Sequence, residues 1–236
     1  MTPPDAKNIG DRPEDLAGDE DAGRWQHLPA ALLLLPMIAA YAVLTWTRGD
    51  MNDWAVWPAR LANGEYGSVG LHMLAHGGLL HLVFNGTALV ALAPPVMDRL
   101  GPLSLRTLAA FLILFVLSGL AGLALWLALP QARPMLGASG AILGLLGFIL
   151  RQPDPLGGPI PLVGRDMARA VLTFVKLHVP LVILFAIPLL LGSEGFGLAW
   201  ESHLGGFIAG LLLYGPVVRL AGGYPTPATP AAPPRT

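Results

Sequence analysis

The chain has 236 residues, of which 54% are hydrophobic and only 12% are charged, and its formal net charge is −1. A soluble domain carries about 25% charged residues, so the composition excludes an ordinary soluble protein and indicates an integral membrane protein. The small net charge gives no reason to expect a nucleic-acid partner, and the absence of cysteine from the sequence excludes disulfides and thiolate chemistry.

Six apolar segments follow one another along the chain, and most approach or exceed the length of about 20 residues that a helix needs to cross a bilayer. We therefore predict an all-α membrane protein with six transmembrane helices. The predicted spans are Leu28 to Trp46, Leu74 to Val96, Leu105 to Leu129, Leu136 to Leu150, Ala170 to Leu191 and Leu198 to Leu220.

Two polar tails flank the predicted membrane domain of residues 28–220. Residues 1–27 are acid-rich without an apolar face, and residues 221–236 are rich in Pro and Ala, so both are predicted to be disordered. In the first loop, Trp54 and Trp57 are aromatic residues typical of a membrane surface. Lys176 and His178, near one end of the fifth span, fit snorkelling or packing side chains.

The distribution of basic residues predicts the orientation in the membrane. Six spans put both tails on one side, and ten of the 14 Lys and Arg residues lie in the tails and the loops of that side, against three in the other loops. The positive-inside rule then places both termini in the cytoplasm and the starts of the second, fourth and sixth spans toward the outer face. With no organelle-type leader before the first span, we expect a bacterial inner membrane.

Polar side chains inside a membrane are costly, so each is a candidate for function. The second span and its outer end hold four of them at spacings of four, five and four residues: His72, His76, His81 and Asn85. The helical repeat puts His81 and Asn85 on one face. We expect His72 and His76 to have structural or loop-anchoring roles.

Ser139 heads the fourth span between Gly137 and Gly140. Small residues of this kind are also ordinary helix-packing material. The sixth span, however, carries His203 near its start, toward the same leaflet as Ser139. Gly206 and Gly210 follow His203 at the spacing that lets helices pack closely. We therefore predict that Ser139 and His203 meet, with the imidazole as the base that activates a serine nucleophile.

The same region can supply donors for an oxyanion. The N–H of Ser139 lies at a helix start, where backbone N–H groups have no partner within the helix, and His81 and Asn85 can add side-chain donors. No acid is well placed to orient His203. Glu201 projects from another helix face, and Glu194 in the preceding loop stays open, so a Ser–His dyad is predicted rather than a triad.

Taken together, these residues resemble the rhomboid intramembrane serine proteases. The resemblance rests on three motifs in order, at the heads of the second, fourth and sixth spans: His72-x3-His76-x4-His81-x3-Asn85, Gly137-Ala138-Ser139-Gly140 and His203-x2-Gly206-x3-Gly210. It implies a six-helix bundle with a water-filled cavity open to the outer face.

The resemblance also implies roles. Ser139 would be the nucleophile and His203 the base, with His81, Asn85 and the Ser139 N–H as the oxyanion hole. Substrates would be transmembrane proteins in the lipid bilayer, with no metal or cofactor, and the oligomeric state is left open. The chain departs from the family pattern at Gly67-Ser68, where many members carry Trp-Arg, and at Leu143, where many carry an aromatic residue.

Two other classes of function stay open from the sequence. A metalloenzyme could use His72, His76 and His81, because a four-residue step places two imidazoles on one helix face. Met73, however, stands where a metalloprotease motif needs its glutamate. A catalytically silent protein that binds membrane helices would need neither Ser139 nor His203, so the presence of both residues disfavours it.

Overall fold

The computed structural model describes residues 25–131, 133–155, 157–190 and 198–223, and the predicted tails lie almost wholly outside these ranges. Within them the chain is helical, with no β-strand beyond one isolated bridge between Val56 and Met135. The helices are α2 Leu28–Trp46, η1 Met51–Asp53, α3 Pro58–Ala62, α4 Gly67–Leu71, α5 Leu79–Leu100, α6 Leu105–Leu127, α7 Ser139–Arg151, α8 Arg165–Leu190 and α9 Trp200–Ala221.

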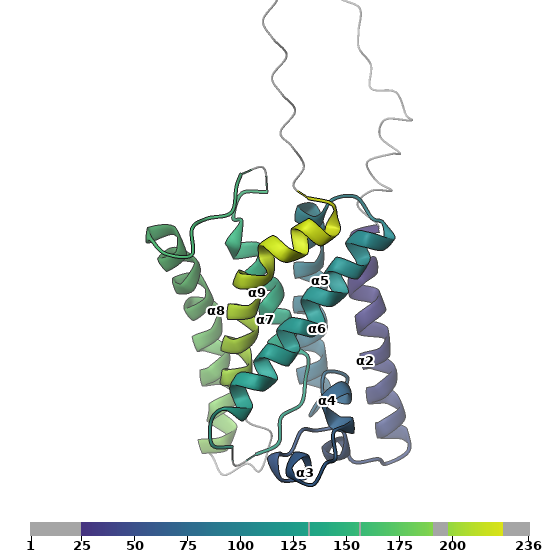
Figure 1. Ribbon diagram of the computed structural model, residues 1–236. Coiled ribbons are helices and arrows are strands. Elements are labelled where there is room, and N and C mark those ends of the chain that lie inside the picture. The colour runs from purple at the N-terminus through teal and green to yellow at the C-terminus, as the bar shows by residue number, and fades with distance from the viewer. Residues whose placement is uncertain (1–24, 132, 156, 191–197, 224–236) are drawn as a thin grey trace, which may run out of the picture.

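The long helices form one bundle, and the prediction of an all-α membrane protein is confirmed (Figure 1). In the described part of the chain, five helices are long and apolar enough to cross a membrane, namely α2, α5, α6, α8 and α9. Helix α7 has 13 residues, fewer than the about 20 that a crossing needs, so the number of six crossings stays a prediction.

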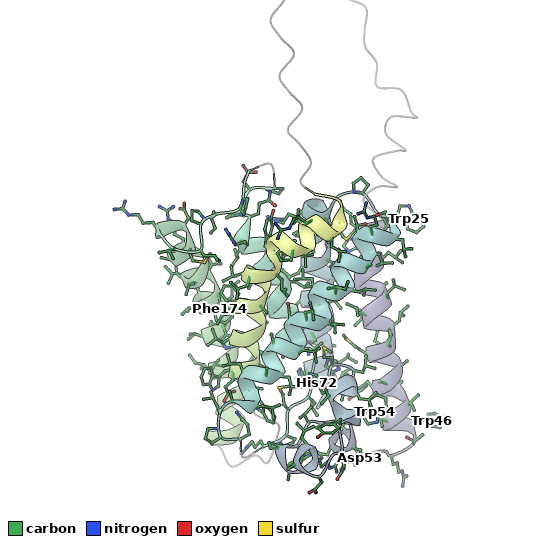
Figure 2. The ribbon with its side chains drawn as sticks, viewed as in Figure 1. Trp25, Trp46, Asp53, Trp54, His72 and Phe174 are labelled. Carbon is green, nitrogen blue, oxygen red and sulfur yellow. The ribbon has the colours of Figure 1, made fainter. Side chains whose placement is uncertain are left out.

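Exposed tryptophans mark both ends of α2. Trp25 is 54% exposed and Trp46 is 90% exposed, and they lie at opposite ends of the helix (Figure 2). Aromatic residues at both ends of an apolar span are typical of the two membrane–water interfaces. The short helices α3 and α4 lie at the same end of the bundle as Trp46 (Figures 1 and 2).

Helices α6, α7 and α9 pack in the centre of the bundle, while α2 and α8 lie on its outside (Figure 1). Glycines allow the close central packing: a Cβ atom on Gly206 would fall on the carbonyl oxygen of Gly140, and one on Gly210 on that of Gly144. The backbones of α7 and α9 are therefore in direct contact along two helical turns, as small residues in membrane helices permit.

Several helix boundaries differ from the predicted spans. Helix α5 begins at Leu79 rather than Leu74, so His72 and His76 precede the helix instead of belonging to it. Helix α7 begins at Ser139, because Gly137 has a positive φ of 108° and breaks the helical path. Helix α8 begins at Arg165 rather than Ala170, so its first turn is polar.

At its other end, α5 continues to Leu100, beyond the predicted end of the span at Val96. The side chain of Arg99 is buried and points at main-chain carbonyl groups. Its Nε and Nη2 donate to the carbonyl of Gln152 at 2.8 and 2.6 Å, and its Nη1 donates to that of Pro95 at 2.6 Å. The guanidinium thus ties α5 to the end of α7.

Candidate functional site

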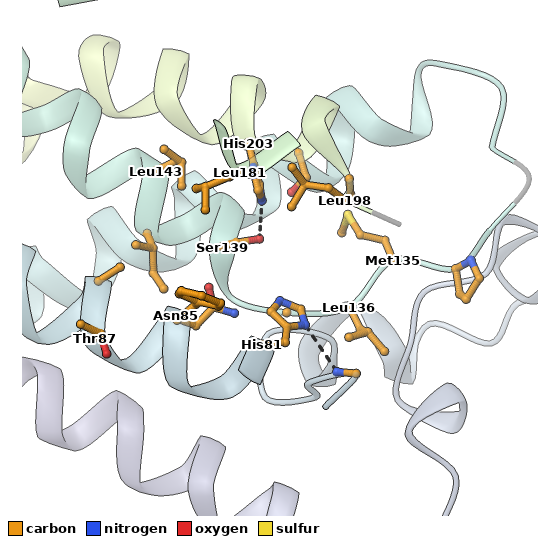
Figure 3. Close-up of a pocket in the computed structure, with 18 of the residues that line it drawn as sticks. His81, Asn85, Thr87, Met135, Leu136, Ser139, Leu143, Leu181, Leu198 and His203 are labelled. Atoms are coloured by element: carbon orange, nitrogen blue, oxygen red, sulfur yellow. Dashed lines mark hydrogen bonds between the residues drawn. The ribbon is translucent and has the colours of Figure 1, made fainter. Parts of the chain in front are cut away.

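A cavity of about 580 Å³ lies between α5, α7, α8 and α9 (Figure 3). Its wall is mostly apolar, with residues such as Met135, Leu136, Leu143 and Leu181. The polar groups that reach it come from three helices and include His81, Asn85, Ser139 and His203. A mostly apolar cavity with a few convergent polar groups is the usual form of a ligand or active site.

The hydroxyl of Ser139 and the imidazole of His203 are in contact at the wall of this cavity (Figure 3). Ser139 Oγ lies 2.6 Å from His203 Nε2, and the His203 ring is only 2% exposed. In the tautomer with an unprotonated Nε2, the serine O–H donates to this nitrogen. The structure therefore brings together the two side chains that the sequence predicted to meet, in the geometry of a nucleophile and its base.

The segment before α7 holds Ser139 in place. The N–H of Gly137 donates to the carbonyl of His72 at 2.8 Å, which ties this segment to the end of α4. A Cβ atom at Gly137 would lie 2.7 Å from the His81 ring, and its φ of 108° is unfavourable for any other residue. Glycine at this position thus lets the chain pass beside His81 and turn into α7 at Ser139.

His81 and Asn85 lie one turn apart on α5 and face the same cavity (Figure 3). The N–H of Gly77 donates to Nδ1 of His81 at 3.4 Å, so Nε2 is the protonated nitrogen and a donor. Nδ2 of Asn85 is buried and bonds to none of the described residues. Both side chains can therefore donate to an oxygen that forms beside Ser139.

His72 and His76 lie in the turn between α4 and α5. Their Nδ1 atoms donate to the carbonyls of Val69 at 2.9 Å and Leu74 at 3.2 Å, respectively. Burial lowers the pKa of both rings below its ordinary value, which keeps them neutral. His76 also packs edge-on against His81, with ring centroids 5.0 Å apart. With these contacts, His72 and His76 stabilise the turn that precedes α5 next to His81.

The alternative of a metal site on His72, His76 and His81 finds little support in this arrangement. Among the residues that the structure describes, no group of three or more His, Asp or Glu side chains is arranged to hold a metal ion.

The second neighbour of His203 is a residue to which the sequence analysis gave only a packing or snorkelling role. His178 on α8 is 8% exposed, and its Nδ1 lies 3.3 Å from Nδ1 of His203. The sequence alone does not reveal this contact, because 25 residues separate the two histidines and nothing in the spacing fixes how α8 is turned. Glu201 is half-buried on α9 and Glu194 lies outside the described residues.

The two positions that depart from the family pattern have other neighbours here. Leu143 lines the cavity and packs against a cluster that includes Phe174 and Phe207. Gly67 and Ser68 begin α4, and Trp54 and Trp57 in the preceding segment pack around Ala55, Ala75 and Leu136. The first loop is thus joined to the cavity wall at Leu136, and also by the bridge between Val56 and Met135.

Comparisons with known proteins identify the family of the chain. The family model of the Rhomboid domain matches residues 63–220. A Bacillus subtilis protein named "Putative rhomboid protease YdcA" is 28% identical over 191 residues, which cover 79% of this chain and 82% of that protein. The Arabidopsis thaliana "RHOMBOID-like protein 4" is 28% identical over 138 residues, which cover 58% of this chain and 30% of that protein. Residues 63–220 include every residue that lines the cavity.

Proposed function

The chain belongs to the rhomboid family of integral membrane proteins, and we propose that it is an intramembrane serine protease that cleaves transmembrane segments of other proteins. The observation that carries this proposal is the contact of 2.6 Å between Ser139 Oγ and His203 Nε2 in a mostly apolar cavity. A hydroxyl and an imidazole inside a membrane cost free energy, so their presence indicates a function. This pair has the geometry of nucleophilic catalysis.

In the proposed first half-reaction, Ser139 Oγ attacks the carbonyl carbon of the scissile peptide bond. As the O–C bond forms, the serine proton moves to Nε2 of His203, and the carbonyl oxygen becomes an oxyanion. His81, Asn85 and the N–H of Ser139 at the start of α7 stabilise this charge by donating hydrogen bonds. When the C–N bond breaks, the proton on Nε2 passes to the leaving amine and an acyl-enzyme remains.

In the second half-reaction, water attacks the acyl carbon while His203 Nε2 takes a proton from it. The second tetrahedral intermediate collapses, the ester bond breaks, and the proton on Nε2 returns to Ser139 Oγ. Each step uses only protein side chains, the peptide and water. Water has to reach Ser139, and the cavity volume of about 580 Å³ leaves room for it beside a peptide segment.

We also propose that both termini lie in the cytoplasm and that the cavity opens toward the outer face of a bacterial inner membrane. The excess of Lys and Arg in the tails and in the loops on their side supports this orientation. The two ends of the described chain lie at one end of the bundle, and α3 and α4 lie at the other (Figure 1).

Cleavage of a reporter protein with one transmembrane segment tests the proposed activity. The purified chain in proteoliposomes should cut the reporter, and Ser139→Ala and His203→Ala should each lower kcat by about 10⁴-fold or more, because each removes half of the reacting pair. Ser118→Ala is the matched control, since Ser118 is a buried serine on α6 outside the cavity. A fluorophosphonate probe should label the wild type and not the Ser139→Ala protein.

Two results would decide against the protease. Undiminished turnover by Ser139→Ala would exclude the proposed nucleophile. A cellular phenotype that Ser139→Ala rescues as well as the wild type would favour a protein that binds membrane helices without cutting them.

A further inference from the structure

His178 occupies an unusual position for a histidine in a helix that faces lipid on one side. The residue is 8% exposed, although Leu177 and Val179 beside it on α8 are exposed. It stacks on Phe174 with centroids 5.1 Å apart and an interplanar angle of 12°, and it meets the His203 ring edge-on at 4.9 Å and 72°. Figure 2 shows Phe174 on α8. The His178 ring is thus held between a flat aromatic ring and the imidazole of His203.

The proposed role of His203 as a base decides which nitrogen of each ring carries the proton. Nε2 of His203 accepts from Ser139, so in the neutral ring the proton is on Nδ1. This Nδ1–H faces Nδ1 of His178 at 3.3 Å, which must then accept it. His178 in turn carries its proton on Nε2. The three groups form one directed chain, from Ser139 O–H to His203 and from His203 N–H to His178.

Packing alone does not account for a histidine at this position. Nε2 of His178 is buried and, among the described residues, has no hydrogen-bond partner. An unsatisfied N–H in an apolar site destabilises the protein, and a phenylalanine would stack on Phe174 without that cost. What a phenylalanine could not supply is the lone pair that Nδ1 of His178 offers to His203.

We propose that His178 is a positioning residue for His203: it accepts the Nδ1–H, selects the tautomer with a free Nε2, and orients that nitrogen toward Ser139. This inference rests on the proposed function, because it assigns His178 a part in the same proton transfer. When His203 takes the serine proton, its Nδ1–H stays bonded to His178, and no further bond forms or breaks. A neutral imidazole thus takes the place that an acid holds in a Ser–His–Asp triad.

Two substitutions separate this role from packing. His178→Phe keeps a ring that can stack on Phe174 but removes the acceptor. His178→Asn removes the ring but keeps an amide oxygen close to the place of Nδ1. We expect His178→Phe to lower kcat by about 10- to 100-fold with KM nearly unchanged, less than the loss of a triad carboxylate, and His178→Asn to stay within about threefold of wild type. Val175→Phe on the exposed side of α8 is the control for added ring volume.

A second measurement does not depend on turnover. With ¹⁵N-labelled histidine in lipid bilayers, the imidazole resonances should report His203 with a proton on Nδ1 and none on Nε2. In His178→Phe this preference should be lost, and in His178→Asn it should remain. Thermal unfolding in the same lipids should be similar for the three proteins.

These measurements distinguish a failure of the inference from a failure of the proposed function. If the wild type cleaves and His178→Phe cleaves equally well, or His178→Asn is as impaired as His178→Phe, the positioning role is wrong and the protease stands. If the wild type does not cleave at all, the protease is wrong, and the ¹⁵N spectra still test the contact. An unchanged His203 tautomer in His178→Phe would overturn the inference in either case.

Discussion

At the scale of single residues, the side chains around Ser139 differ in what they can contribute to catalysis. In the proposed mechanism Ser139 and His203 exchange a proton, whereas Asn85 has only a donor to offer, from a buried Nδ2 that bonds to none of the described residues. A buried donor without a partner is costly in the resting protein. The cost is recovered if the donor meets a charge that exists only in the transition state, which is how an oxyanion hole accelerates a reaction.

We therefore expect Asn85→Ala to act on kcat. Removing one oxyanion donor costs about 10²- to 10³-fold in kcat in subtilisin, and KM should change little because the uncharged carbonyl needs this donor less. Thr87→Val is the matched control, since Thr87 is a polar residue of the same helix on the same cavity wall. Steady-state kinetics on the reporter give both constants. An effect confined to KM would mean that Asn85 binds substrate rather than the oxyanion.

At the scale of helices, the position of Ser139 relative to His203 depends on how closely α7 approaches α9. Gly206 faces the carbonyl of Gly140, and Gly210 faces that of Gly144, with no room for a Cβ atom at either glycine. Gly140 follows Ser139 directly, and Gly206 lies one turn after His203. The contact that stabilises the bundle therefore also fixes the distance between the two reacting groups.

Gly206→Ala should consequently destabilise the protein and reduce cleavage together. The added methyl group meets backbone rather than a movable side chain, and overpacking of this kind costs about 1–3 kcal/mol. Gly70→Ala is the control: it makes the same change in helix α4 with nothing within 4 Å, and helix propensity favours alanine by about 1 kcal/mol. Thermal unfolding in detergent, followed by tryptophan fluorescence, measures both. Equal stability of Gly206→Ala and wild type would mean that α7 and α9 do not pack so closely.

The helices also illustrate what the sequence can and cannot predict. Hydropathy locates α2 at Leu28–Trp46 without error, because that segment is apolar along its whole length. It begins α5 and α7 too early, because Leu74 and Leu136 are apolar residues that pack in loops beneath the helices. Apolar composition reports burial, whereas the start of a helix depends on backbone conformation, such as the positive φ at Gly137.

The candidate site, too, could be predicted from the sequence only in part. Ser139, His203, His81 and Asn85 stand out in the sequence because polar groups are rare in apolar spans. Their placement at one cavity could be expected from the common direction of three helices. His178 could not be identified in this way, because its contact with His203 depends on the rotation of α8 about its own axis, which no spacing within the sequence specifies.

At the scale of the whole molecule, the proposed orientation requires that the cavity and the chain ends face opposite sides of the membrane. The Val56–Met135 bridge joins the first loop to the cavity wall. The segment with α3 and α4 lies at this end, and α6 begins at the other end (Figure 1). If the positive-inside rule holds here, the first loop is outside and the start of α6 is in the cytoplasm.

The natural absence of cysteine makes this orientation directly measurable, because any added thiol is the only one in the chain. Glu65→Cys places it between α3 and α4, and Arg106→Cys places it in the first turn of α6; both positions are exposed. A maleimide that cannot cross membranes should label Glu65→Cys in intact cells and Arg106→Cys only after the cells are permeabilised. The wild type should stay unlabelled throughout. The reverse pattern would place the cavity on the cytoplasmic side, and then substrates would have to be cut near their cytoplasmic ends.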